Sequence, residues 1–406
     1  MMFKYELRKV FSRTSNMIAM LLLFFVVVIV CWFAMDVSYV DKSGKTKVGP
    51  SAVSALRKEQ KKWSGYLDEE KIRQVIMENR KIVSSPEYQS DNIRESQIAY
   101  NKGQGIMDIR NLLNHSFADG FCDYNYYQAD KLTEELAPQF YKNRIRLLRE
   151  WLDNEASEEY SDIEKEYLIR KYENIQTPFY YDYITGWSQL FDYAPTVVMI
   201  TMLVLGYLVA GIFSNEFSWK TDTIFFTSLY GRNKATVAKI KAGFCVVTGI
   251  YLLTMLVYTG VTLLYLGAEG WSCPIQIVFS DWKSFYNIEV WQEYLLIVIG
   301  GYIGCLFISF LSMWVSAKTK SAVIAIIIPF VILFIPSFLG NINTPVINKI
   351  LGLLPEQLLQ IGNVLDYFNL YSFGNKVFGA VPILLVLYSL LAFVLVPIIY
   401  LEYQKK

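Results

Sequence analysis

The chain has 406 residues, of which 53% are hydrophobic and only 18% are charged. A mean hydropathy of +0.28 is too high for a soluble enzyme of this size, and 38 basic against 37 acidic residues leave no net attraction for nucleic acid. A single histidine, His115, and five cysteines without a C-x-x-C pair exclude a multi-histidine metal site and a zinc ribbon. The composition therefore predicts a polytopic α-helical membrane protein.

The N-terminus combines an amphipathic segment with a long apolar run. A helix over residues 1–16 places four apolar side chains on one face, between basic neighbours: Phe3, Leu7, Val10 and Phe11. This pattern predicts a helix that lies in the cytoplasmic interface of the bilayer. Residues 17–35 are an uninterrupted apolar run of 19 residues, and roughly 20 are needed to cross the membrane. The alternative is a cleaved signal peptide, whose apolar core is shorter, about 7–15 residues, so we interpret 17–35 as the first transmembrane helix.

Five further apolar segments contain no ionisable side chain: 194–213, 242–266, 294–316, 322–339 and 379–401. A charge at the bilayer centre costs about 2.5–3.5 kcal/mol, so six charge-free segments predict six transmembrane helices. The two termini and the loops on their side hold 13 lysines and arginines, whereas the alternate short loops hold three. The positive-inside rule then places both termini in the cytoplasm, in a multi-pass protein of the plasma membrane.

Residues 36–193 form one large connection between the first two predicted spans, on the extracytoplasmic side. Apolar residues recur there at helical spacing, and Ser161 with Glu164 forms a capping-box pattern. We expect a mainly helical extracytoplasmic domain. Two interpretations of its tyrosine cluster stay open, since the rings belong either to the ordinary surface of a self-contained domain or to a ligand site: Tyr124, Tyr126 and Tyr127.

Residues 340–378, before the last span, hold apolar pieces that are broken by Gly352 and Pro355 and are too short to cross the membrane. Backbone at membrane depth must be covered by protein or water. We therefore predict a re-entrant segment on the outer side. Cys122 and Cys273 are the two cysteines expected on that side, which leaves a disulfide between them open.

The predicted spans offer no residue for chemistry within the membrane. Ion-coupled carriers and intramembrane hydrolases need ionisable groups there, and none is present. Ser43-Gly44-Lys45-Thr46 resembles the end of a phosphate-binding loop, but Tyr39 stands where its first glycine belongs. We therefore predict no catalytic residue, no metal site and no cofactor in this chain, and expect its free-energy input to come from a partner.

The loop 214–241 is the most informative segment on the predicted inner side. Five residues share one face of a short helix that we expect to end near Gly231: Phe217, Thr221, Ile224, Phe225 and Leu229. Glu216 is expected to cap or orient the first turn of this helix, where a negative charge suits the helix dipole. The alternative is an ordinary basic loop on the inner side of the membrane.

This loop resembles the segment between the second and third spans of type-2 ABC-exporter permeases. In that family an acidic residue follows the second span, then come a threonine-containing helix, a turn that ends in arginine, and a lysine that enters the third span. The matching positions here are Glu216, Thr221 or Thr223, Phe226 to Leu229, Arg232 and Lys239, whereas Tyr230-Gly231 stands where proline and serine are commoner. The interfacial helix and the six predicted spans agree with the same family, and only 36–193 lies outside the resemblance.

The resemblance implies the membrane subunit of an ATP-driven exporter that moves an amphipathic drug, peptide or lipid outward. It implies a second permease half, identical or not, and separate ABC ATPase subunits that bind ATP and Mg²⁺, while this chain itself is not an enzyme. The implied coupling residues are Glu216, Thr221, Thr223, Arg232, Lys234 and Lys239. The alternative is an ABC-type sensor, mechanotransmission or immunity permease, whose outer domain acts on a peptide, lipid or cell-wall partner without translocation. Six spans favour transport, and the large outer domain favours the alternative.

Overall fold

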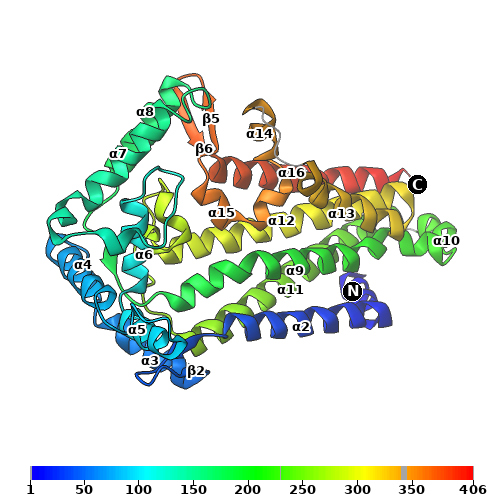
Figure 1. Ribbon diagram of the computed structural model, residues 1–406. Coiled ribbons are helices and arrows are strands. Elements are labelled where there is room, and N and C mark those ends of the chain that lie inside the picture. Colours follow the sequence, from blue (N-terminus) through cyan, green and yellow to red (C-terminus); the bar gives the residue numbers. More distant parts are fainter. Residues whose placement is uncertain (1, 229, 340–344, 406) are drawn as a thin grey trace.

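The computed structural model describes residues 2–228, 230–339 and 345–405, and it is mostly helical (Figure 1). Five helices are long and apolar enough to cross a membrane: α2 (Thr14–Ala34), α9 (Thr185–Ser218), α11 (Thr236–Leu266) with the π-helical turn before it, α12 (Val290–Thr319) and α16 (Ala380–Gln404). These five helices suggest a membrane-embedded protein. The sixth predicted span corresponds to α13 (Ala322–Leu339), in which the apolar stretch Ala322–Pro336 is shorter than the other five.

Helices α9 and α12 form the centre of this bundle. Helix α9 packs on α12, α11, α2 and α13, and α12 packs on α16 as well. In the most apolar part of α9, 67% of the residues are buried, against 28% in α2 and 22% in α16. Gly301 of α12 permits the close approach of α11, because a Cβ at this position would collide with the Tyr251 hydroxyl. The apolar outer faces of α2 and α16 are exposed on the surface of the bundle, as is typical of helices that face lipid.

The predicted domain 36–193 packs as a mainly helical unit at one end of the bundle, except that its last residues, 185–193, already belong to α9 (Figure 1). Its α-helices are α3 (Pro50–Lys61), α4 (Glu69–Val83), α5 (Ile93–Gly103), α6 (Met107–Ser116), α7 (Phe140–Asp153) and α8 (Asp162–Glu173), and its 3-10 helices are η1 (Gln128–Lys131) and η2 (Glu134–Gln139). Two short antiparallel pairs complete it, β1 (Ser38–Val40) with β2 (Thr46–Val48) and β3 (Gly65–Tyr66) with β4 (Tyr180–Tyr181). The predicted capping box at the start of α8 is confirmed, since the Ser161 hydroxyl accepts from the Glu164 amide and the Glu164 carboxylate accepts from the Ser161 amide.

Two connections lie between the bundle and this domain. The first carries the 3-10 helices η4 (Ile275–Ile277) and η5 (Ser280–Lys283). The second carries α14 (Pro345–Leu351), η6 (Pro355–Leu359), α15 (Ile361–Asp366) and the hairpin of β5 (Leu370–Phe373) with β6 (Lys376–Gly379). Helices η6 and α15 pack on α12, while the first residues of the predicted re-entrant segment, 340–344, lie outside the described residues. Cys122 and Cys273 are both free cysteines, so the disulfide left open by the sequence does not form in this structure.

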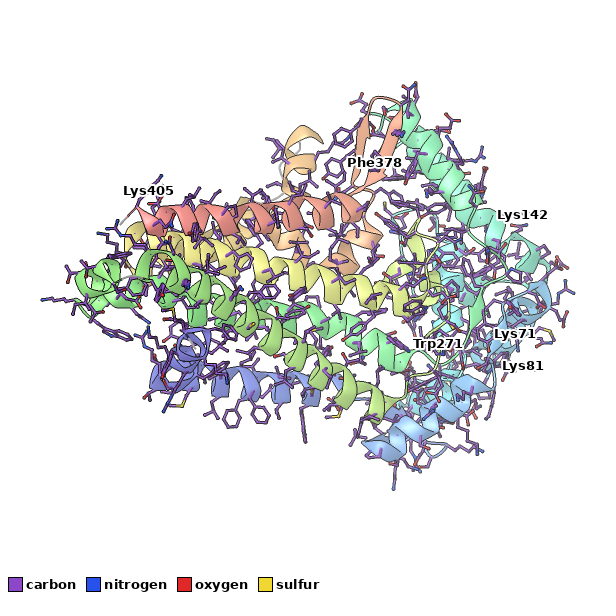
Figure 2. The ribbon with its side chains drawn as sticks, turned by 180° about the vertical axis from the view of Figure 1, so that it is seen from behind. Lys71, Lys81, Lys142, Trp271, Phe378 and Lys405 are labelled. Atoms are coloured by element: carbon purple, nitrogen blue, oxygen red, sulfur yellow. The ribbon has the colours of Figure 1, made fainter. Side chains whose placement is uncertain are left out.

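The molecule thus has two distinct ends. Both chain termini and the short helix α10 (Asp222–Thr227) lie together at one end, here named the terminal end (Figure 1). The domain formed by 36–193 occupies the opposite end, here named the domain end. Figure 2 shows the same separation from behind, with Lys405 at one end and Lys71, Lys81 and Lys142 at the other. Helix α9 has 34 residues and connects the two ends without a break.

Candidate functional site

The loop 214–241 has a different structure from the predicted one. Helix α9 continues through Ser218, and Lys220 then adopts a left-handed backbone conformation with φ of 55°, which ends the helix before α10 begins at Asp222. The single helix predicted over 217–229 is therefore wrong, and Leu229 lies outside the described residues. A π-helical turn, η3 (Gly231–Ala235), then leads directly into α11. Gly231 is required there, since a Cβ would overlap the carbonyl oxygen of Phe225.

Glu216 does not cap the short helix. It lies in the last turn of α9 and is 4% exposed, while the residue that precedes α10 is Thr221. The Glu216 Oε1 atom lies 2.7 Å from the ammonium of Lys239 on α11, which is only 1% exposed. The expectation that Glu216 orients the first turn of the coupling helix is therefore corrected: its carboxylate joins α9 to α11 instead.

A second carboxylate, which was not predicted from the sequence, completes this buried ion cluster. Glu6 of α1 (Met2–Ser12) is 8% exposed, and its Oε2 lies 3.3 Å from the Lys239 ammonium. Lys239 also donates to the carbonyl oxygen of Ile212 at 2.7 Å, so all three N–H bonds have acceptors. We name the group of Glu6, Lys9, Glu216, Lys239 and Tyr403 the Lys239 cluster.

Lys9 balances the charge of the Lys239 cluster. Its ammonium lies 2.9 Å from Glu6 Oε1 and 3.4 Å from Glu216 Oε1. Burial alone would lower the pKa of Lys9, but the hydrogen bonds and negative charges of Glu6 and Glu216 outweigh it and raise the pKa above its usual value. Two carboxylates thus face two ammonium groups. Ions taken out of water are tolerated when they are paired and hydrogen-bonded in this way.

Aromatic rings connect the Lys239 cluster to α10. The Tyr403 hydroxyl of α16 donates to Glu216 Oε2 at 3.3 Å, and its ring lies 5.8 Å from that of Phe225 and 5.1 Å from that of Phe226, both on α10. The Lys239 ammonium lies 5.4 Å from the centre of the Phe225 ring. Helix α10 has only six residues and could not persist alone. It is held against α9, α11 and α16 through these rings.

The space among these residues is too small for a ligand. The cleft that Glu6, Lys9, Arg13, Glu216 and Lys239 line has a volume of about 10 Å³, which is about the size of one water molecule. The Arg13 guanidinium closes its rim by donating to Asn215 Oδ1 at 3.2 Å. The Lys239 cluster therefore serves as a joint between helices and not as a binding pocket.

The remaining predicted coupling residues lie on the exposed side of this joint. Thr221 donates from its hydroxyl to the Glu216 carbonyl at 3.3 Å, and the Thr223 carbonyl accepts from the Thr227 hydroxyl at 2.8 Å. Arg232 and Lys234 are exposed on η3, and the Lys234 ammonium lies 4.4 Å from the Tyr230 ring centre. The structure thus separates the predicted set into two buried residues, Glu216 and Lys239, and four at the surface.

The predicted apolar face of the N-terminal helix is only partly buried. Val10 is 5% exposed and Phe3 and Leu7 are half-buried, whereas Phe11 is 42% exposed. Helix α1 packs mainly on α11. The sequence could have indicated that Glu6 is buried, because it is the only acidic residue of α1 and lies one turn before Val10 on the same face.

A second group of buried ionisable residues lies at the domain end. Asp281 on η5 and Glu293 in the first turn of α12 are 2% and 1% exposed, and Asp366 ends α15. Asp281 and Asp366 share a hydrogen bond, and burial raises the pKa of both carboxyl groups. The charge of Asp281 and the shared hydrogen bond raise the pKa of Asp366 further, whereas the same hydrogen bond partly offsets the rise in the pKa of Asp281. Glu293 Oε2 and Asp366 Oδ1 have no partner among the described residues. Glu293, which directly precedes the predicted span 294–316, is therefore a buried carboxyl group that the structure includes in α12.

Comparisons of this chain with protein-family models, with curated proteins and with solved structures find no match.

Proposed function

We propose that this chain is the permease subunit of an ATP-driven exporter of the type-2 ABC class, with six transmembrane helices, and that α10 is the contact for a separate ATPase subunit. In this proposal the terminal end faces the cytoplasm and the domain formed by 36–193 faces outward. A second permease half completes the pathway, and ATP with Mg²⁺ binds to the ATPase partner. ATP-driven movement of that partner would displace α10 and bias the bundle between two arrangements.

The observation that carries this proposal is the attachment of α10. This short helix lies at the terminal end, beside both chain termini (Figure 1), and Ile224 on its outer side is 73% exposed. Its inner side packs through Phe225 and Phe226 on Tyr403, whose hydroxyl reaches the Glu216–Lys239 ion pair. A force on α10 would therefore pass directly to α1, α9, α11 and α16. An exposed helix with such a rigid inner attachment suits a docking element that transmits motion.

An apolar cleft in the bundle supports an amphipathic substrate. It lies between α9, α12 and α13 and has a volume of about 130 Å³. Its walls are mainly aliphatic and aromatic, and it includes Pro329 of α13 and Ser312 of α12, whose hydroxyl has no partner among the described residues. Pro329 and Pro336 interrupt the hydrogen bonding of α13, so this wall can bend. Two hydroxyl groups, those of Ser312 and Tyr207, in an otherwise apolar wall suit a substrate that is mostly apolar.

The test is an export assay after coexpression with a separate ABC ATPase. Glu216→Gln removes the ion pair inside the joint, and Arg232→Ala removes an exposed charge beside α10. Lys241→Ala removes another exposed charge, on α11, and serves as the control. We expect both test variants to insert and to retain the ATPase but to hydrolyse ATP without export, and the control to export normally. Normal export in both test variants, or an equal loss in Lys241→Ala, would exclude this coupling role and favour the ordinary basic loop.

A sensing or immunity permease remains the second candidate, because the domain formed by 36–193 is tied firmly to the bundle. The buried Arg144 of α7 donates to the carbonyl oxygens of Trp282 and Ser284 at 3.3 and 2.8 Å, and Lys349 lies 2.9 Å from Glu164 of α8. Such contacts would transmit movement between the domain and the membrane helices without transport. ATP-dependent uptake of an amphipathic dye into inverted vesicles would support export, whereas ATPase activity that responds to an external peptide without any uptake would support sensing.

A further inference from the structure

The domain formed by 36–193 contains a pocket that is separate from the Lys239 cluster and from the apolar cleft of the bundle. It has a volume of about 360 Å³, which is in the range of small-molecule sites. Helices α4, α5 and α6 and the turn before η1 form its walls. Four tyrosine rings surround it, namely Tyr88, Tyr100, Tyr126 and Tyr127, and Ile82, Ala99 and Met107 supply aliphatic surface. Tyr126 and Tyr127 belong to the tyrosine cluster of the sequence, whereas Tyr124 packs elsewhere, on His115 and Phe279.

A buried arginine forms the polar part of this pocket. Arg110 of α6 is 4% exposed, and its Nε donates to Asn79 Oδ1 at 3.0 Å while Nη2 donates to Asp130 Oδ1 at 2.9 Å. Its third nitrogen, Nη1, is buried and has no hydrogen-bond partner among the described residues. An unpaired buried donor on a charged group is unfavourable, so an acceptor that reached Nη1 would be bound with a gain in free energy.

The charge of Arg110 is already balanced. Asp130 accepts from Arg110 and from Asn79 Nδ2 through Oδ1, and from the Tyr88 hydroxyl through Oδ2 at 2.7 Å. Burial and the neighbouring Asp130 carboxylate raise the pKa of Tyr88 to about 12, so this phenol stays a neutral donor at physiological pH. A ligand carboxylate at Nη1 would be repelled by Asp130, whereas a carbonyl oxygen would not. The balance of charges therefore selects a neutral acceptor.

One ring covers the free nitrogen. Tyr126 lies with its ring centre 4.3 Å from the Arg110 guanidinium carbon, and the ring is 41% exposed. Its hydroxyl makes only a 4.0 Å contact with the Met107 sulfur, so rotation of this side chain would break no strong hydrogen bond and would cost only its ring contacts with Arg110 and Tyr127. Turning the ring away would open Nη1 to the pocket, while the hydrogen bond to Asp130 keeps Tyr88 in place.

From this geometry we infer that the pocket binds an uncharged amide ligand, such as an apolar peptide segment, whose carbonyl oxygen accepts from Arg110 Nη1 and whose apolar side chain stacks on the tyrosine rings. Tyrosine offers large contact areas with little loss of conformational freedom, which suits peptide recognition. Helix α4 lies at the domain end, far from both termini (Figure 1), so the ligand would arrive from water. This inference goes beyond the proposed export function and does not depend on it.

The experiment uses the purified full chain in detergent and ligand-observed NMR with two probes, N-acetylphenylalaninamide and N-acetylphenylalanine. Tyr100→Ala removes a pocket ring that is 46% exposed, and Tyr66→Ala removes a ring of the same domain that is 63% exposed and outside the pocket. We expect the amide probe to bind, its affinity to fall about tenfold in Tyr100→Ala and to stay unchanged in Tyr66→Ala, and the carboxylate probe to bind more weakly than the amide. Arg110→Lys keeps the positive charge but lacks the guanidinium fork, and we expect it to remove the preference for the amide.

Three results would overturn the inference. Equal affinity of the amide probe for the unmodified protein and for Tyr100→Ala would show that the pocket is not the site. Tighter binding of N-acetylphenylalanine would show an anion site instead, and absence of binding by either probe would exclude amide recognition. The tyrosine variants make the test independent of Arg110→Lys, whose buried position risks the fold.

Discussion

Replacing Lys239 by methionine tests whether the Lys239 cluster is a structural joint. The substitution keeps most of the side-chain volume and leaves Glu6 and Glu216, which are 8% and 4% exposed, with Lys9 as the only remaining cation of the cluster. Removing one partner of a buried ion pair costs about 3–5 kcal/mol. For a chain of 406 residues we expect the thermal unfolding midpoint of the purified protein to fall by about 4–6 °C.

Lys9→Met is the matched control, because the Lys9 side chain contacts the same two carboxylates but is 40% exposed. An exposed pair contributes only about 0–1 kcal/mol, so its unfolding midpoint should change little. A double variant, Lys239→Met with Glu216→Gln, removes one charge of each sign and should regain part of the loss, with a coupling of about 0.5–3 kcal/mol between the two sites. If Lys239→Met and Lys9→Met lower the midpoint equally, or if the double variant loses the sum of the single effects, the Lys239 cluster does not hold the helices together.

Three further outcomes follow from the structure. Ser51 and Asn233 are both exposed but lie at opposite ends of the molecule. In a cysteine-free background and with the proposed orientation, Ser51→Cys should react with an impermeant thiol reagent on intact cells and Asn233→Cys should not. The reverse labelling would invert the proposed orientation. Because the pKa of Asp366 is raised in the folded state, its contribution to stability is fully present below the unfolded value of about 4 and is lost progressively as the pH rises from there towards the folded value. Asp366→Asn should therefore be more stable than the unmodified protein at pH 8, with a smaller fall in unfolding midpoint between pH 5 and pH 8, and an unchanged pH profile would contradict the raised pKa. Tyr403→Phe keeps the ring against α10 and loses only the hydrogen bond to Glu216, so it should cost about 1 kcal/mol, and a much larger loss would show that the hydroxyl and not the ring holds α10.

The apolar helices could be predicted because their signal is local. A charge-free run of about 20 residues is visible in any short window of the sequence, and five of the six predicted segments correspond to helices of sufficient length. The capping box at Ser161 was equally local, since its two members are three residues apart. The sixth segment, over 322–339, contains Pro329 and Pro336, and its apolar stretch is shorter than the others.

The candidate site could be predicted only in part, because its members are distant in sequence. Glu6 and Lys239 are separated by 233 positions, and no local pattern links an acid in a basic N-terminal helix to a lysine at the start of a later span. The end of α9 was also missed, because the residue that adopts the left-handed conformation there is Lys220 and not a glycine. Likewise, tyrosines of the pocket were visible as a cluster, whereas Arg110 and Asp130, which fix its polarity, come from separate elements.

The continuity of α9 has a mechanical consequence. At about 1.5 Å per residue, its 34 residues make a rod of roughly 50 Å, and a rotation of only about 5° about one end would displace the other by roughly 4 Å. No loop interrupts this rod between the domain end and Glu216 in its last turn, and Pro195, which removes one backbone hydrogen bond, lies near the domain end of the helix. The rod can therefore work as a lever in either direction. A small rotation around α10 becomes a larger displacement at the domain end, and a slight tilt of the domain becomes a shift of several ångströms at the terminal end.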